Sequence, residues 1–188
     1  DVLAEAASRI TLAFMCGNRD FLVGGELLRE CGVRALPDPT VLVAFGERLL
    51  LSHGDALCLD DREYQQFRAQ VRSPAWQREF LSRPLPQRRE AARAMRDHSE
   101  QRKLGMAVAD WVDIDKATAV RWMHEANAPT LIHGHTHRPS HDDLAPGVAG
   151  RQREADLPLG GVLDRPGEEL AVGHVVAAAR GDEAAALD

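Results

Sequence analysis

The sequence lacks a paired set of cysteines and has no long apolar run. Its 188 residues include three cysteines, Cys16, Cys31 and Cys58, without C-x-x-C spacing. An odd number at these spacings argues against a disulfide framework and a structural zinc site, so we expect a reducing, cytosolic environment. No stretch of about 18 apolar residues is present, and we therefore predict no membrane-spanning helix.

Acidic residues are scarce in one segment, although the formal net charge of the chain is −6. Residues 62–103 contain 11 Arg or Lys against 5 Asp or Glu, whereas residues 151–188 contain 4 against 8. Nucleic-acid-binding proteins usually carry positive charge more widely and interleave it with aromatic residues. The local basic segment favours a phosphorylated small ligand or an anionic lipid surface. We expect no nucleic-acid partner, and no obligate protein partner is evident.

Short apolar runs that end in glycine indicate buried strands followed by loops. Residues 9–16 and 130–137 have this pattern, and residues 40–55 indicate a strand, a turn and a second strand. Residues 24–32 are typical of a helix closed by glycine, and residues 60–126 are mostly helical by periodicity. Strands punctuated by helices predict an α/β fold, in which loops at strand ends hold ligands.

The segment HGHTHRP, residues 133–139, places three histidines within five positions. In a strand, residues i and i+2 face the same way, so His133 and His135 can project together while Gly134 allows close approach of the backbone. Two imidazoles on one side are a ready pair of metal ligands. A histidine-rich surface turn and core histidines bonded to the backbone are the alternatives.

Two other strand ends carry similar residues. His53 follows an apolar strand and precedes Gly54 and Asp55, while Asn18 and Arg19 follow the first strand. Each could be a simple turn, because capped and Asx-type turns are common. Three strand-end loops that each offer a ligand or an anion partner favour a shared metal and phosphate site.

The set G-N-R-D-F, H-G-D-x-L-C and H-G-H-T-H-R-P resembles the calcineurin-like metallophosphoesterases, and among them the UDP-2,3-diacylglucosamine diphosphatases of lipid A biosynthesis. Arg19, where the wider superfamily has histidine, narrows the resemblance, which covers residues 9 to about 141. The resemblance implies hydrolysis of the diphosphate bond of UDP-2,3-diacylglucosamine to UMP and 2,3-diacylglucosamine 1-phosphate. It also implies a peripheral location on the cytoplasmic face of the bacterial inner membrane.

The expected fold is a partial calcineurin-like metallophosphoesterase sandwich of the α/β class, with an inserted helical lid. Residues 1–141 would form this domain, with the helical insertion at about 60–126. Residues 142–188 form a poorly patterned tail in which the sequence predicts no structure.

The resemblance also implies roles for individual residues. Asn18, His53 and His133 would ligate one Mn²⁺ ion and His135 another, with His133 and Asn18 acting in catalysis. Metal ions at such a site activate water and stabilise charge on the phosphate. The implied contacts to the UDP-linked acylated glucosamine are Asn18, Arg19, Asp61, Ser99, Lys103 and His133. An anionic inner-membrane surface is the second expected partner.

Two metal-binding motifs of the family, D-x-H and a later G-D, lie upstream of the asparagine motif, and the 17 residues before Asn18 contain neither. Two dications about 3.5 to 4 Å apart repel by roughly 18 kcal/mol at an effective dielectric constant near 20. Without the bridging carboxylate we expect at most one ion and an inactive chain, and we expect the sequence to begin inside a longer protein. A metallophosphoesterase of other specificity and a degenerate, non-catalytic binding scaffold are the alternatives.

Overall fold

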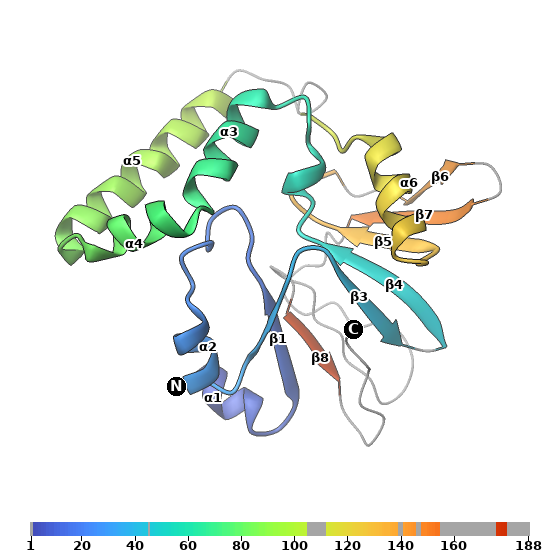
Figure 1. The fold of residues 1–188 in the computed structure, drawn as a ribbon, viewed down its shortest axis with the longest axis horizontal. Helices are drawn as coiled ribbons and strands as arrows, with labels where there is room; N and C mark the ends of the chain where they lie inside the picture. Colours follow the sequence, from blue (N-terminus) through green and yellow to red (C-terminus); the bar gives the residue numbers. More distant parts are fainter. Residues whose placement is uncertain are drawn as a thin grey trace. The chain divides into compact units, whose positions relative to one another are not determined.

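The computed structural model describes residues 2–44, 46–104, 112–138, 141–145, 148–154 and 176–179. The chain divides into two compact units. Residues 1–58 and 114–188 form one, called here the sandwich unit, and residues 59–113 form the other, called the helical unit. Figure 1 shows strands throughout the first and helices α3, α4 and α5 in the second.

The sandwich unit contains two β-sheets of mixed direction. In the first, β1 (Thr11–Met15) lies between β2 (Arg34–Leu36) and β8 (Val176–Ala179), parallel to β2 and antiparallel to β8. The second sheet has the order β3-β4-β5-β7-β6. Its strands are β3 (Thr40–Ala44), β4 (Glu47–Ser52), β5 (Thr130–His133), β7 (Val148–Glu154) and β6 (His141–Ala145). The predicted α/β class is confirmed.

The two sheets share an apolar core. Met15 of β1 packs with Leu42 of β3 and Leu51 of β4. Because side chains alternate along a strand, the opposite face of β1 is free to pack elsewhere, and there Leu12 meets Leu28 of α2 (Gly25–Glu30). Each such apolar side chain contributes about 1.5–3 kcal/mol when fully buried. This packing anchors the strands whose ends carry the candidate site.

The β3–β4 hairpin matches the strand, turn and strand predicted for residues 40–55. Its second strand, β4, pairs in parallel with β5, and β5 pairs in parallel with β7. The chain between β4 and β5 includes η1 (Asp55–Leu57), the helical unit and α6 (Lys116–Glu125). Parallel neighbours require such a long crossover, and here a whole unit is inserted into it.

Helix α6 belongs to the sandwich unit. It contacts β5 and β6, and the guanidinium of Arg48 on β4 donates to the carbonyls of Ala126 and Asn127 at its end. The compact helical unit therefore ends at residue 113 rather than near 126, the limit expected from helical periodicity. Periodicity shows that a segment is helical, but not which sheet or helix it packs against.

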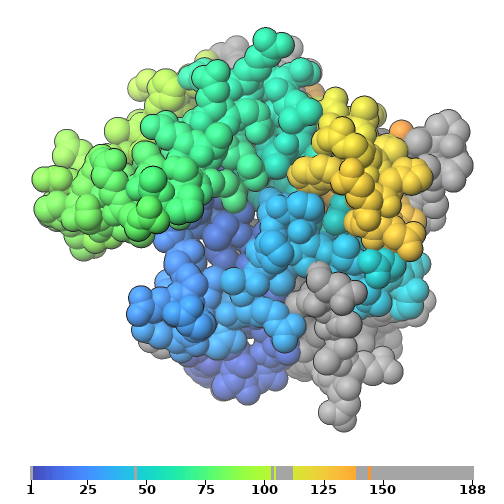
Figure 2. All heavy atoms as spheres, in the orientation of Figure 1, coloured from blue at the N-terminus to red at the C-terminus, as the bar shows by residue number. Residues whose placement is uncertain are grey.

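The helical unit consists of α3 (Arg62–Val71), α4 (Pro74–Ser82) and α5 (Leu85–Lys103). The side chains of Asp61 and Ser73 cap α3 and α4 by accepting from the amides of Tyr64 and Trp76. Pro74 occupies the first turn of α4, where its missing N–H costs no hydrogen bond. Figure 2 shows the side chains of these helices (green) as one continuous body.

Strands β6, β7 and β8 lie almost entirely in the segment for which the sequence predicted no structure. Strand β6 pairs with β7, β7 also pairs with β5, and β8 pairs with β1. The pairings of β7 with β5 and of β8 with β1 join parts of the chain that are distant in sequence. Residues 155–175 and 180–188 of the same segment lie outside the described residues. None of the helices in the described ranges is both long and apolar enough to cross a membrane.

Candidate active site

Strands β4 and β5 deliver two of the predicted loops to the same edge of their sheet. The parallel register pairs Ser52, the last residue of β4, with His133, the last residue of β5. The pairing continues one step beyond the strands, because Gly134 N donates to His53 O at 3.1 Å. His53 therefore leaves the sheet beside the His133–Gly134 segment.

The loop after β1 meets this edge through its glycine. A Cβ atom placed on Gly17 would lie 2.7 Å from both Cδ2 and Nε2 of His53, so only glycine lets the loop backbone approach the imidazole this closely. Asn18 follows directly. The ring of His135 lies on His53 as well, with 5.1 Å between ring centroids and a 58° tilt. All three loops singled out in the sequence thus converge at His53.

His133 is buried, and its tautomer follows from its contact. Its Nδ1 lies 2.9 Å from Gly134 O, and because a carbonyl oxygen only accepts, Nδ1 carries the proton. The lone pair is then on Nε2, a buried atom. A neutral imidazole with its proton held on one nitrogen is the form that ligates a metal through the other.

His53 lies against a buried carboxylate. Its Nδ1 is 3.2 Å from Oδ1 of Asp55, in a contact that is not aligned as a hydrogen bond. The Nε2 edge of the ring lies beside Gly17. A carboxylate behind a histidine is a common second layer around metal ligands, because it orients the ring and raises its basicity.

The prediction that His133 and His135 project together from one strand is wrong. Strand β5 ends at His133, and His135 has a left-handed backbone with φ of 76°, so the strand rule for residues i and i+2 does not apply. A turn brings His135 to His53, and His137 is also left-handed, with φ of 55°. This conformation costs a non-glycine residue roughly 1–2 kcal/mol, and residues held in it cluster at functional sites.

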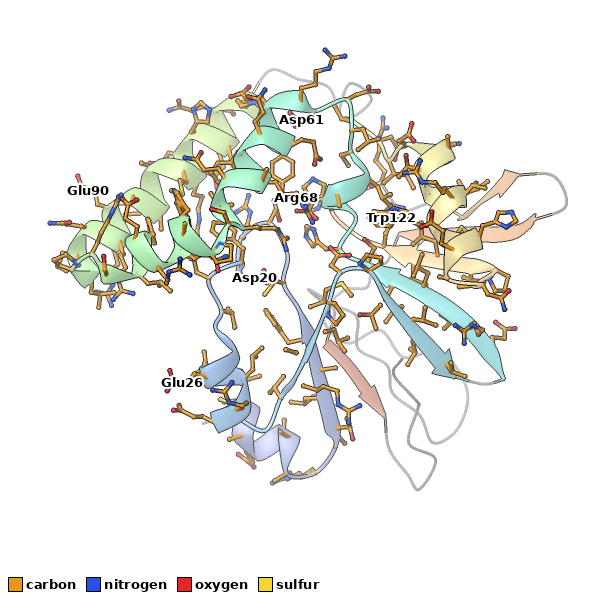
Figure 3. All side chains as sticks on the ribbon, in the orientation of Figure 1. Asp20, Glu26, Asp61, Arg68, Glu90 and Trp122 are labelled. Carbon is orange, nitrogen blue, oxygen red and sulfur yellow. The ribbon has the colours of Figure 1, made fainter. Side chains whose placement is uncertain are left out.

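The Asn18–Arg19 loop is shaped by a short turn. A side-chain oxygen of Asp20 accepts from Gly17 N, three residues earlier, whereas in the Asx-type turn of the alternative interpretation the side chain accepts from an amide two residues later. This hydrogen bond closes the loop at Gly17, the residue that lies against His53. Arg19 is exposed, so its guanidinium is open to an anion. Figure 3 shows Asp20 in the loop that follows β1.

The other substrate contacts implied by the resemblance lie in the helical unit. Asp61 caps α3 and also accepts from Arg102 of α5 at 3.2 Å, and Figure 3 shows it at the start of its helix. Ser99 is half-buried on α5, one turn before Arg102. The ends of α3 and α5 that carry Asp61 and Ser99 are therefore neighbours. Lys103 is the last residue of α5, and its side chain lies outside the described residues.

Among the described residues, no group of three or more His, Cys, Asp or Glu side chains has the arrangement of a metal site. The donors that converge are imidazole nitrogens and the loop that bears Asn18, whose amide oxygen is a further type of donor. In burial, and for His133 also in tautomer, the two imidazoles fit a divalent cation.

Three residues around the site were not assigned by sequence reasoning. Asp55 stood in the HGD motif beside His53, where its role could have been inferred from the frequency of carboxylate and histidine pairs. Asp38 and Ser52 carried no signal in the sequence. They bond to one another only because the hairpin register brings them together, with Ser52 Oγ donating to Asp38 Oδ1 at 2.7 Å.

Two mixed sheets, a helical insertion, and histidines at the ends of β4 and β5 define an α/β sandwich of the metallophosphoesterase class. No family model matches the sequence. The chain is 49% identical over 140 residues to the UDP-2,3-diacylglucosamine hydrolase of Chromobacterium violaceum, which covers 74% of this chain and 59% of that protein. It is also 49% identical over 142 residues to the protein of that name from Aromatoleum aromaticum, and this match covers 75% of this chain and 58% of that protein.

The match to the UDP-2,3-diacylglucosamine hydrolase of Bordetella pertussis is longer, with 41% identity over 178 residues, 88% of this chain and 68% of that protein. The chain belongs to the UDP-2,3-diacylglucosamine hydrolase family. It spans less than three fifths of the length of the Chromobacterium and Aromatoleum relatives.

Proposed function

We propose that this protein acts in the hydrolysis of the diphosphate bond of UDP-2,3-diacylglucosamine, which yields UMP and 2,3-diacylglucosamine 1-phosphate. The observation that carries the proposal is the convergence of His53, His135 and the Gly17–Asn18 loop in a chain 41–49% identical to relatives of that name. The names of the relatives supply the substrate. The donors at the strand ends suit metal-assisted attack of water on phosphorus.

In this proposal Nε2 of His53, Nε2 of His133 and the side-chain oxygen of Asn18 would hold one divalent cation, and His135 would ligate another. Held by these residues, a cation would supply Lewis-acid chemistry, lowering the pKa of a water ligand and offsetting negative charge on the phosphate oxygens. Nitrogen and oxygen donors without thiolate suit Mn²⁺. The carbonyl of Gly134 keeps the proton of His133 on Nδ1, so this histidine is ready to bind without reorientation, and the carboxylate of Asp55 confines the ring of His53.

Arg19 is proposed to bind the diphosphate, because its planar guanidinium matches two phosphate oxygens. In the helical unit, Asp61, Ser99 and Lys103 are proposed to contact the polar groups of the sugar nucleotide. Arg89, Arg93 and Arg96 recur at helical spacing on α5, and all three are exposed. Such a basic face suits the anionic surface of a membrane, which is where the acylated substrate resides.

Metal binding is tested first by titrating the metal-free 188-residue chain with Mn²⁺ and measuring heat and the Mn²⁺ electron paramagnetic resonance signal. One bound ion is expected, and His53→Ala or His133→Ala should weaken its binding at least 10-fold. His124→Ala is the matched control, because His124 is exposed on α6 of the same unit. Unchanged affinity in both His53→Ala and His133→Ala would refute the metal site.

Turnover is tested with this chain and with a fusion protein that adds, ahead of residue 1, the D-x-H and G-D segments of a family member. We expect the 188-residue chain to release no UMP and the fusion protein to hydrolyse UDP-2,3-diacylglucosamine in preference to bis-p-nitrophenyl phosphate. Preference for the simple diester would favour a phosphoesterase of other specificity. A fusion protein that binds Mn²⁺ and both compounds without turnover would instead support a binding scaffold.

A further inference from the structure

Asp38, an acidic residue two positions before β3, lies opposite the candidate ligand His53. The antiparallel register pairs Thr40 with Leu51, and one further step of two residues places Asp38 across from His53. Asp38 Oδ1 accepts from His53 N at 3.3 Å and from Ser52 Oγ at 2.7 Å. One carboxylate oxygen thus contacts two consecutive residues at the end of β4.

Ser52 extends this contact to the next residue. While its hydroxyl donates to Asp38, its oxygen accepts from Gly54 N at 3.0 Å. Ser52 is fully buried, and Gly54 has a left-handed backbone with φ of 98°. The bonds therefore define the path of the backbone immediately before, at and after His53.

The imidazole of His53 is meanwhile confined on three sides. Asp55 faces its Nδ1, the backbone of Gly17 lies against its Nε2 edge, and the ring of His135 lies on it. Because the ring is attached to this backbone, a shift at residue 53 would move it out of these contacts and displace Nε2 relative to His133 and Asn18. A metal site tolerates little displacement of a ligand, so the anchoring of this backbone bears on affinity.

We infer that Asp38 is a positioning residue, which holds His53 through Ser52 and the His53 amide so that its Nε2 meets the cation. The inference rests on the proposed metal site. Hydrogen bonding is the means, because the carboxylate accepts from the hydroxyl of Ser52 and from the amide of His53. The competing explanation is that Asp38 only closes the β3–β4 hairpin.

The test measures the Mn²⁺ dissociation constant and the melting temperature of the metal-free 188-residue protein for each variant. Asp38→Ala is expected to weaken Mn²⁺ binding about 10-fold, the lower end of what residues behind metal ligands contribute. The Mn²⁺ dissociation constant of Asp38→Asn should stay within about threefold of the wild-type value, because the amide oxygen of asparagine still accepts both hydrogen bonds. Val43→Ala is the matched control, since Val43 is half-buried at the other end of the same hairpin and pairs with Arg48.

A hairpin-closing role predicts that Asp38→Ala and Val43→Ala change affinity equally for an equal drop in melting temperature. Positioning predicts a loss of affinity in Asp38→Ala alone, and none when Asp38→Ala is added to His53→Ala, because the two changes act on one contact. Should Asp38→Ala fail to fold, Ser52→Ala replaces it, with a loss of about threefold or more expected.

The outcomes separate this inference from the proposed function. If His53→Ala binds Mn²⁺ as the parent does, the metal site itself fails. If His53→Ala weakens binding but Asp38→Ala and Ser52→Ala do not, the metal site stands and the positioning role is overturned. Equal losses in Asp38→Asn and Asp38→Ala would also overturn it, because they would trace the effect to charge rather than to hydrogen bonding.

Discussion

Asp55 and His53 form a buried pair, with 3.2 Å between Oδ1 of the carboxylate and Nδ1 of the imidazole. The side chains are 0% and 7% exposed, so water does not screen the contact. Since Gly54 separates the two residues, the pair depends on the left-handed turn at that glycine. The carboxylate of Asp55 therefore confines the Nδ1 edge of the imidazole.

Replacing Asp55 by asparagine should weaken Mn²⁺ binding by about 10- to 100-fold, as expected when the partner of a ligating histidine is lost. The substitution keeps the shape of the side chain but removes the negative charge, which favours a proton on Nδ1. Mn²⁺ titration gives the affinity, and ¹⁵N NMR of the metal-free protein gives the tautomer of His53. Asp55→Asn with both measurements unchanged would show that the carboxylate has no such role.

Replacing Gly54 by alanine should destabilise the protein by at least about 1–2 kcal/mol, the cost of a left-handed backbone for a residue with a Cβ atom. The added Cβ would also lie 2.5 Å from Gly134 O and 3.1 Å from Nδ1 of His133, which forces β4 and β5 apart at the site. Urea denaturation measures the free energy of unfolding. Gly24→Ala serves as control, because Gly24 has φ of −84° and no atom within 4 Å of the new methyl group.

Replacing Arg102 by alanine should lower the free energy of unfolding of the helical unit by less than about 1 kcal/mol, because the ion pair with Asp61 is partly exposed. Asp61→Ala should cost more, about 0.5–2 kcal/mol, because it also removes the cap of α3. A double-mutant cycle in low and high salt measures the coupling. Arg83→Ala, which breaks an exposed pair with Glu79, is the control; a coupling that salt does not reduce contradicts the ion-pair explanation.

Asp115 makes the stability of the sandwich unit dependent on pH in acid. Its carboxylate accepts hydrogen bonds from Thr118, which lower its pKa from the ordinary value of 3.8, and it caps α6. Because the unfolded chain then binds the proton more readily, the stabilisation is complete above pH 3.8 and is lost as pH falls through the lower pKa of the folded state.

The expected result is that Asp115→Ala lowers the melting temperature at pH 7 and that this difference shrinks as the pH falls below 3.8. Asp115→Asn is the control, because its amide oxygen still caps the helix but does not titrate. Thermal denaturation followed by circular dichroism between pH 2 and pH 7 measures both variants. A difference between Asp115→Ala and wild type that is constant over this range would exclude the carboxylate as its source.

Much of the candidate site was predictable because its signals are local. The apolar runs before Gly17, His53 and Gly134 predict buried strands that end in loops, and the structure confirms those strands as β1, β4 and β5. Residue type alone indicates which side chains could bind a cation or a phosphate. The roles predicted for the site residues stay predictions; these residues are Asn18, Arg19, His53, Asp61, Ser99, Lys103, His133 and His135.

The amino-acid sequence by itself determined that apolar strands precede the loops of the site, and which donors these loops carry, because hydrophobicity and glycine act over a few residues. Only the tertiary structure decided that a left-handed turn carries His135 to His53, that Asp38 faces the end of β4, and that α6 belongs with the strands. Those outcomes depend on strand register and on packing between residues far apart in the chain, and no local pattern of side chains contains that information.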